Sequence, residues 1–195
     1  MKQPKKNSKK ICNEIALIQT RVPDKRLEVW LQDEARVGQH GRLTRIWGER
    51  GKRIRIPKDM SFAYTYIYGE VCPERDVGEA IVINEVSKEA MEQHLQAVSN
   101  TIPSDRHGVM LMDKAPWHRS LKVPANITIV YLPSYSPELN ACENVWEYLK
   151  NNFLSNRVFN TMEDIMDACC NAWMMLTNEQ GRIKSIASRK WTTVN

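Results

Sequence analysis

The chain has 195 residues, 42% of them hydrophobic, and its 28 Lys and Arg against 23 Asp and Glu give a net charge of +5. No apolar run approaches the roughly 18 to 20 residues of a membrane-spanning helix, which predicts one soluble domain with a sizeable core. The mildly basic balance permits a polyanionic partner such as nucleic acid without requiring one. The five cysteines are odd in number and form no CxxC pair, which disfavours a zinc site or disulfide framework and favours a reducing cytoplasm.

The first 25 residues differ in character from the rest of the chain. The opening "MKQPKKNSKK" is basic, and no apolar stretch of the kind found in a signal peptide follows it. We interpret residues 1–25 as a basic linker or N-terminal helix, with a solvated tail as the alternative. Residues 26–195 are expected to form the folded domain.

Three strand patterns occupy the first half of the domain. In "RLEVWLQDEAR", Leu27, Val29 and Leu31 alternate with Glu28, Trp30 and Gln32, and the same alternation places Asp33 on the face of the leucines. Residues 45–56 are predicted to form two short extended pieces around a glycine turn. Residues 61–71 and 79–86 are rich in β-branched and aromatic side chains. With turn-like segments between them, these pieces predict an antiparallel meander.

The second half of the domain mixes helices with buried strands. Residues 87–100 have apolar side chains at helical spacing. The run 109–112 does not alternate, which is typical of a parallel strand covered on both faces, and residues 126–133 predict a further strand. Three helices are expected after them: one beginning near Pro137 and continuing to about residue 152, one at residues 162–176 with a capping box at Thr161 and Asp164, and one at residues 178–191.

Two aspartates stand where these strands are expected to end. Active sites of open α/β sheets gather at the carboxyl ends of strands, and Asp33 and Asp113 follow the predicted strands directly. A buried carboxylate costs several kcal/mol unless a hydrogen bond, a basic group or a cation compensates it. The alternative for each aspartate is a turn cap or an ion pair with Arg36, Lys114 or Arg119.

A third acidic group lies on the helix expected after Pro137. Asn140, Glu143, Asn144 and Glu147 recur at steps of three and four residues and share one polar stripe. If Glu143 faces the crevice, it joins the two aspartates as a third hard oxygen ligand, which Mg²⁺ or Mn²⁺ prefers. Glu138 and Glu147 compete for this role, and an ordinary solvated helix face is the alternative for all three glutamates.

Three sequence blocks resemble the signature of a known family. "WLQDEARVG", "MDKAPWHRS" and "YLPSYSPELNACENVWEYLK" are similar, in order and spacing, to the blocks of DDE-superfamily transposases of the bacterial insertion-sequence branch related to mariner elements. The resemblance covers about residues 26 to 155. It implies a ribonuclease-H-like α/β fold with a mixed sheet, consisting of a three-strand antiparallel meander plus two parallel strands, flanked by helices.

The resemblance also implies an activity. Asp33, Asp113 and Glu143 would be the catalytic and metal-binding triad, and they would hold two Mg²⁺ ions, with Mn²⁺ as a substitute, for DNA cleavage and strand transfer at element ends. The chain would act on element ends and target DNA as a homodimer or larger assembly, in the bacterial cytoplasm at the nucleoid. The alternative is a non-catalytic relic or regulatory fragment that associates with a full-length transposase.

The chain departs from the family pattern in two ways. Ser134 and Ala141 replace prolines of the third block without removing an acidic residue. Family members also begin with helix-turn-helix modules, and only about 25 residues precede the first strand here. We therefore expect a separate helix-turn-helix subunit or reading frame to supply sequence recognition, whether the chain is one half of a frameshifted element, a relic or an excised domain.

Weaker expectations concern supporting and DNA-contacting residues. His118 is expected to touch the scissile phosphate or orient a ligand, with a backbone-bonded loop histidine as the alternative, and Asn140 is a second supporting candidate. Arginines and lysines follow DNA backbones, whereas basic side chains at the edge of a soluble hairpin are the alternative here. The candidate DNA-binding residues are Arg36, Arg45, Lys52, Arg53, Lys114 and Arg119.

Overall fold

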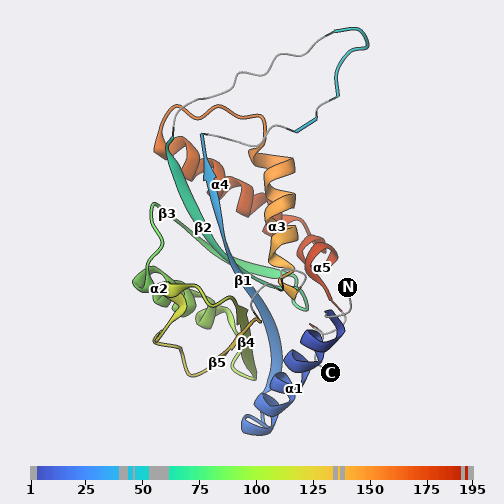
Figure 1. Ribbon diagram of the computed structural model, residues 1–195, viewed down its shortest axis with the longest axis vertical. Coiled ribbons are helices and arrows are strands. Elements are labelled where there is room, and N and C mark those ends of the chain that lie inside the picture. The colour runs from blue at the N-terminus through green and yellow to red at the C-terminus, as the bar shows by residue number, and fades with distance from the viewer. Residues whose placement is uncertain are drawn as a thin grey trace.

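A mixed five-stranded sheet forms the centre of the protein (Figure 1). The computed structural model describes residues 4–39, 44–45, 47–52, 62–133, 136, 139–189 and 192. The sheet has the order β3-β2-β1-β4-β5, in which β1 to β3 form an antiparallel meander and β4 and β5 run parallel to β1. The predicted mixed sheet is therefore confirmed. The strands are β1 (Arg26–Gly38), β2 (Tyr64–Cys72), β3 (Val77–Ile83), β4 (Arg106–Met112) and β5 (Ile127–Tyr131).

Helices cover both faces of the sheet (Figure 1). One face packs against helices from the two ends of the chain, and the other packs against a single long helix. The first group comprises α1 (Pro4–Arg21), α3 (Cys142–Leu149), α4 (Met162–Asn178) and α5 (Arg182–Ala187), and the single helix is α2 (Lys88–Thr101). A π-helical turn, η3 (Lys150–Leu154), continues α3, and a short 3₁₀ helix, η1 (Pro116–His118), follows β4. No helix in these ranges is both long and apolar enough to cross a membrane.

Alternation along β1 divides the core into two clusters. Val29 and Leu31 join the cluster beneath α1, α3 and α4, whereas Trp30 joins Tyr68 in the cluster beneath α2. Strand β4 is buried on both faces, as predicted from its unbroken apolar run. The sheet is therefore a rigid layer with its hydrophobic surface satisfied on both sides.

Two of the predicted helix starts need comment. The capping box of α4 is confirmed: Thr161 Oγ1 accepts the backbone N–H of Asp164, and the Asp164 side chain accepts the N–H of Thr161. The helix expected near Pro137 instead begins at Cys142. Asn140 Oδ1 accepts the N–H of Cys142, the first residue of the helix, whereas the N-cap residue Ala141 makes no side-chain cap bond. Residues 137–138 lie outside the described ranges.

Strand β1 is longer than predicted. The expectation that it ends at Gln32 is wrong, because antiparallel pairing with β2 continues to Gly38 and Tyr64, beyond the last level shared with β4. Gln39 then closes the ends of the connection, since its N–H donates to Ala63 O and its Oε1 accepts Ala63 N–H. Residues 46 and 53–56 of the predicted extended pieces lie outside the described residues, and segment 47–52 lies beyond the end of the sheet (Figure 1).

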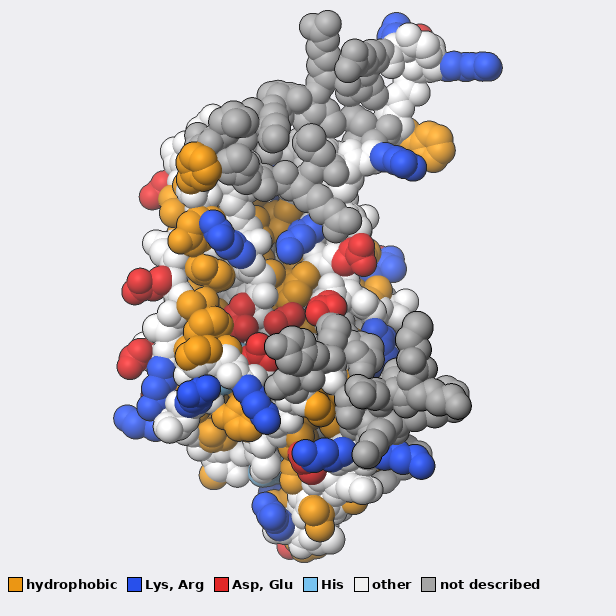
Figure 2. All heavy atoms as spheres, viewed as in Figure 1, with side chains coloured by type: hydrophobic (Ala, Val, Ile, Leu, Met, Phe, Trp, Pro, Cys, Tyr) orange, Lys and Arg blue, Asp and Glu red, His pale blue; other side chains and the backbone are white. Residues whose placement is uncertain are grey.

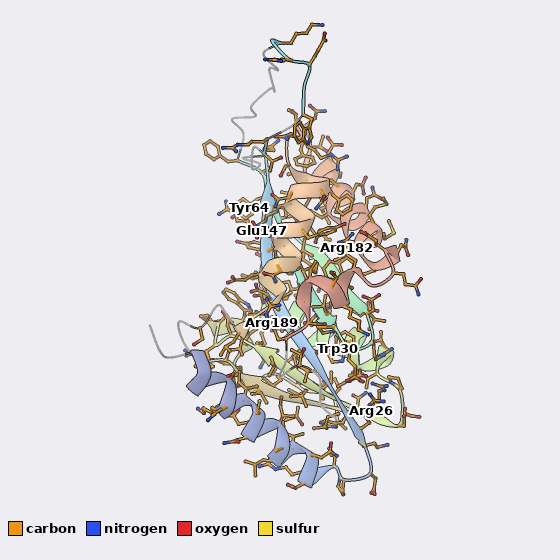
Figure 3. All side chains as sticks on the ribbon, turned by 90° about the vertical axis from the view of Figure 1, so that its right-hand side faces the viewer. Arg26, Trp30, Tyr64, Glu147, Arg182 and Arg189 are labelled. Carbon is orange, nitrogen blue, oxygen red and sulfur yellow. The ribbon has the colours of Figure 1, made fainter. Side chains whose placement is uncertain are left out.

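The amino end of β1 is fixed by charge. Buried Glu28 accepts hydrogen bonds from Trp30 Nε1, Arg75 and Arg106. These three side-chain donors offset the free-energy cost of burying the Glu28 carboxylate, so Glu28 has a structural role. Figure 3 shows Arg26, which begins β1, and Tyr64, which pairs with its last residue, near opposite ends of this long strand.

A second buried carboxyl pairs with a histidine beneath α2. Glu70 on β2 and His94 on α2 are both fully buried, with Glu70 Oε2 against His94 Nε2. Burial raises the pKa of Glu70 well above its ordinary value and lowers the pKa of His94 to about 3. Both shifts favour the uncharged form, so a neutral carboxyl faces a neutral imidazole in this core.

Candidate active site

Asp33 and Asp113 lie at the same level of two neighbouring parallel strands. From Arg26 with Arg106 to Leu31 with Leu111, each β1 residue pairs with the β4 residue eighty positions later. Continuing that register by two residues reaches Asp33 on β1 and Asp113, the first residue after β4. The predicted adjacency of the two strands is therefore confirmed, although Asp33 lies within its strand and not at its end. Figure 2 shows acidic side chains gathered near the middle of one face of the molecule.

Asp33 and the residue before it are bonded to Trp146 on α3 and to Asn140, two residues before that helix. Trp146 Nε1 donates to Asp33 Oδ2 over 3.0 Å, and Asn140 Nδ2 donates to the carbonyl of Gln32 over 2.8 Å. Burial raises the pKa of Asp33 to about 7, with further contributions from the charges of Glu34 and Asp113, while the Trp146 bond opposes the shift. Asn140 therefore joins the segment before α3 to the residue that precedes Asp33.

A glycine opposite Asp33 makes room for this tryptophan. Gly69 on β2 is the pairing partner of Asp33. A Cβ at this glycine would lie 2.5 Å from Cη2 of Trp146 and 2.9 Å from Cη2 of Trp173. The absence of a side chain at residue 69 leaves room for the Trp146 ring, whose Nε1 reaches the carboxylate.

Asp113 is fixed by the turn that follows it. Its Oδ1 accepts the N–H of Ala115 over 2.8 Å and lies 2.8 Å from Nδ1 of His118. The hydrogen bond from His118 is the main cause that lowers the pKa of Asp113 below its usual value. Asp113 thus caps its own turn, which was the alternative interpretation. Within the described residues neither aspartate forms an ion pair with Arg36, Lys114 or Arg119.

His118 lies between two carboxylates. Its Nε2 is 2.8 Å from Glu34 Oε1, opposite the contact of Nδ1 with Asp113. Because both ring nitrogens face carboxylate oxygens, both donate and the ring is an imidazolium. Burial alone would lower the pKa of His118, but the bonds to Asp113 and Glu34 raise it to about 9. The side chain makes these contacts in addition to a 3.3 Å approach to the Asp113 carbonyl, so it is more than a backbone-bonded loop histidine.

Two contributors to the site were missed in the sequence. Glu34 had no assigned role because strict alternation places it on the opposite face of β1 from Asp33. Trp146 belongs to the apolar side of its helix, and nothing in the spacing predicts that its indole N–H turns toward a carboxylate. The signals available were the Asp-Glu doublet at 33–34 and the histidine five residues after Asp113.

Glu143 is exposed in the first turn of α3. It lies between Asn140, which is bonded to Gln32, and Trp146, which is bonded to Asp33. Among the described residues, however, no three Asp, Glu, His or Cys side chains converge closely enough to hold a metal ion. Glu143 thus lies on the helix whose Trp146 contacts Asp33, and its recruitment as a ligand stays a prediction. Glu147 lies one turn further along and is also exposed.

The candidate DNA-binding residues fall into separate places. Lys114 and Arg119 are exposed and flank the turn that holds Asp113. Arg36 is exposed on β1, with its guanidinium 3.7 Å from the centre of the Tyr64 ring. Arg45 and Lys52 are exposed in the short segments between β1 and β2, where Lys52 pairs with Glu49. Arg53 lies outside the described residues.

The donors near Asp33 suit a divalent cation. The aspartates supply hard oxygen atoms, which Mg²⁺ and Mn²⁺ prefer, and burial raises the pKa of Asp33, with smaller contributions from the charges of Glu34 and Asp113. No cationic side chain of the described residues forms an ion pair with Asp33. A bound cation would relieve the mutual repulsion of the two carboxylates, so the residues present fit such an ion.

The architecture and the paired aspartates define a ribonuclease-H-like nuclease fold, and comparisons with known proteins agree. The chain belongs to the DDE superfamily endonuclease family, whose model matches residues 28–166. It is 42% identical over 130 residues to the Sinorhizobium fredii (strain NBRC 101917 / NGR234) protein y4pE/y4sA, described as uncharacterized, covering 66% of this chain and 96% of that protein. The family resemblance of the three sequence blocks is thereby confirmed.

Solved structures of the Mos1 transposase share the fold. The paired-end complex with the left transposon end matches with a TM-score of 0.62 and 12% identity over 94% of this chain. The Mos1 mariner paired-end complexes with Mn and with Mg match with TM-scores of 0.58 and 0.57 and identities of 12% and 14%, over 97% and 92% of this chain. The chain spans 57 to 64% of the length of these Mos1 chains.

Proposed function

We propose that this chain is the catalytic domain of a transposase that cleaves DNA at the ends of an insertion element and joins the freed ends to target DNA. The observation that carries the proposal is the common level of Asp33 and Asp113 on adjacent parallel strands, within a member of the DDE superfamily endonuclease family. The DNA-bound Mos1 complexes that share the fold support DNA as the substrate.

Three acidic residues are assigned to divalent cations in this proposal. Asp113 offers its exposed carboxylate, Asp33 offers the oxygen that Trp146 does not hold, and Glu143 joins them from the first turn of α3. Mg²⁺ bound there would activate water or a 3′-hydroxyl and stabilise the leaving oxygen. The Mos1 complexes with Mn and Mg support this choice of ion.

The chain's own residues provide positioning. Trp146 and Asn140 fix Asp33 relative to α3, so the carboxylates start from a rigid frame, and phosphoryl transfer depends on such in-line placement. Exposed Lys114 and Arg119 beside Asp113 are placed to contact phosphates of the bound DNA. We expect two copies to act together because an element has two ends, and a separate helix-turn-helix partner to supply sequence recognition.

A nicking assay on supercoiled or pre-cleaved element-end DNA tests this function. Wild type should nick in Mg²⁺ or Mn²⁺ and not in excess chelator, with a helix-turn-helix partner added if the chain alone is silent. Asp113→Ala should lose nicking by at least about 100-fold while it keeps its fold. The matched control is Asp105→Ala, because Asp105 is an exposed aspartate directly before the first residue of β4. This variant should remain active.

Two outcomes would oppose the proposal. Full activity in Asp113→Ala would show that the assigned carboxylate is wrong. An inactive wild type, even with the partner and Mn²⁺, would instead favour the regulatory or relic alternative.

A further inference from the structure

The two oxygens of Asp113 have different surroundings. Oδ1 accepts two hydrogen bonds of 2.8 Å, from the N–H of Ala115 and from His118 Nδ1. Among the described residues Oδ2 has no hydrogen-bond donor, and the Asp113 side chain is 61% exposed. A cation that approaches from solvent therefore meets one oxygen whose lone pairs are free and one whose lone pairs are in use.

We propose that His118 and Glu34 are positioning residues that hold Asp113 so that Oδ2 alone faces the divalent cation. This inference rests on the proposed function, because it concerns the same aspartate. It assigns His118 the orienting of Asp113 and adds Glu34 as the residue that holds the histidine, and neither would contact the ion or the DNA.

His118 is rigid enough to position a ligand. It is fully buried, and the 3₁₀ helix η1, which begins at Pro116, folds it back onto Asp113. Tyr131 Oη, at the end of β5, donates to the His118 carbonyl over 2.6 Å. The imidazole is therefore fixed through its backbone to β5 and through its side chain to two carboxylates.

Glu34 sets the direction of the imidazole ring. Its Oε1 accepts His118 Nε2 over 2.8 Å, Trp117 Nε1 over 3.0 Å and Gln32 Nε2 over 3.0 Å. The side chain is only 11% exposed, so this oxygen is a fixed acceptor rather than a mobile surface group. Partners of this kind fix the rotation of a histidine ring, and a ring that rotated would lose Asp113.

The arrangement uses both faces of β1 for one site. Asp33 points toward α3, where it meets Trp146, whereas Glu34 points to the α2 face and reaches Asp113 through His118. Asp33 is thus a proposed ligand itself. The next residue, Glu34, acts on the other proposed ligand, Asp113, through the imidazole ring of His118. A merely structural role for Glu34 and His118 would affect stability but leave metal affinity unchanged in folded protein.

Mn²⁺ binding to the full chain, measured by isothermal titration calorimetry and by electron paramagnetic resonance, separates these roles without requiring activity. His118→Ala and Glu34→Ala should each weaken Mn²⁺ binding by about 10- to 100-fold. The double variant should be no weaker than His118→Ala, because Glu34 acts through the histidine. His107→Ala is the matched control: that buried histidine on β4 bonds Thr128, and Mn²⁺ affinity should stay unchanged.

Circular dichroism and thermal unfolding establish which variants are folded. If His118→Ala does not fold, Glu34→Ala decides the matter, since Glu34 is not fully buried. Wild-type Mn²⁺ affinity in folded Glu34→Ala or His118→Ala overturns the inference, as does a double variant whose loss is the sum of the single losses. Asp113→Ala separates this inference from the proposed function. If Asp113→Ala loses Mn²⁺ binding, the proposed function stands even when the positioning inference fails. If Asp113→Ala binds Mn²⁺ like wild type, the inference and the proposed function are both wrong.

Discussion

Asp33 and Asp113 meet because two parallel strands share a register, although eighty residues of chain separate them. The paired strands β1 and β4 set the level of Asp33 and of Met112, and the turn after β4 fixes the side chain of Asp113. The third proposed ligand, Glu143, is on helix α3, whose Trp146 side chain bonds Asp33. This difference leads to the first prediction.

Glu143→Ala should reduce metal-dependent nicking by about 100-fold or more, whereas Glu147→Ala should reduce it only slightly. Both glutamates are exposed on α3 one turn apart, so the pair is matched for helix and solvent access. The initial nicking rate of each variant relative to wild type, measured once in Mg²⁺ and once in Mn²⁺, gives the size of the effect. Equal losses in the two variants would contradict the assignment, and a larger loss in Glu147→Ala would move the ligand one turn along the helix.

Gly69→Ala should destabilise the protein and lower nicking together. The added methyl group would enter the space of Trp146, which reaches Asp33, and overpacking of this kind costs about 1 to 3 kcal/mol of unfolding free energy. Urea denaturation measures that cost. In a Trp146→Phe background, where the smaller ring leaves room, the same glycine change should cost less; an equal cost in both backgrounds would show that Trp146 is not the obstacle.

Glu70→Gln should change how stability depends on pH. Burial raises the pKa of Glu70 in the folded protein, so above its ordinary value of 4.5 the folded state keeps a proton that the unfolded state loses. The free energy of unfolding of wild type relative to Glu70→Gln should therefore fall as pH rises toward the folded-state pKa, by about 1.4 kcal/mol per unit. Urea denaturation between about pH 5 and 8 tests this. Exposed Glu85→Gln is the control, and parallel curves for wild type and Glu70→Gln would refute the shift.

Lys114→Ala and Arg119→Ala should each lower the affinity for DNA, and each should make that affinity less sensitive to salt. If each side chain contacts one phosphate, each change should lower the slope of log affinity against log salt by about 0.9. Fluorescence anisotropy with unrelated duplexes gives this slope, and the losses should not depend on sequence. Lys9→Ala, an exposed lysine on α1, should leave the slope unchanged; a slope unaffected by all three changes would place the DNA elsewhere.

The sheet could be predicted from sequence because its evidence is periodic. The unbroken apolar run of β4 follows from cover on both faces, and the packing side of α3, which includes Val145 and Leu149, follows from helical spacing. Strand β1 is also covered on both faces, and it alternates because its second face includes Glu28, whose charge Arg75 and Arg106 compensate. The end of β1 could not be predicted in this way, because the strand continues as long as β2 pairs with it, and that partner comes from a distant segment.

The site was predictable in its acidic residues and not in their support. The carboxylates of Asp33 and Asp113 stand out because a charge beside a buried strand needs a reason. The bonds of Trp146 to Asp33 and of Glu34 to His118 join segments more than eighty residues apart, and each uses a side chain that periodicity assigns to packing or to the opposite face. Only the folded arrangement brings such donors and acceptors together.

The clasp between Gln39 and Ala63 has a consequence for protein engineering. Its two hydrogen bonds fix where the connection from β1 to β2 leaves the sheet and where it returns. A replacement that preserves these two residues would begin and end at neighbouring points, so its length need not alter the strand register beneath it. The β1 to β2 connection is thus an insertion point at which a DNA-binding peptide or a fluorescent reporter could be grafted without moving Asp33.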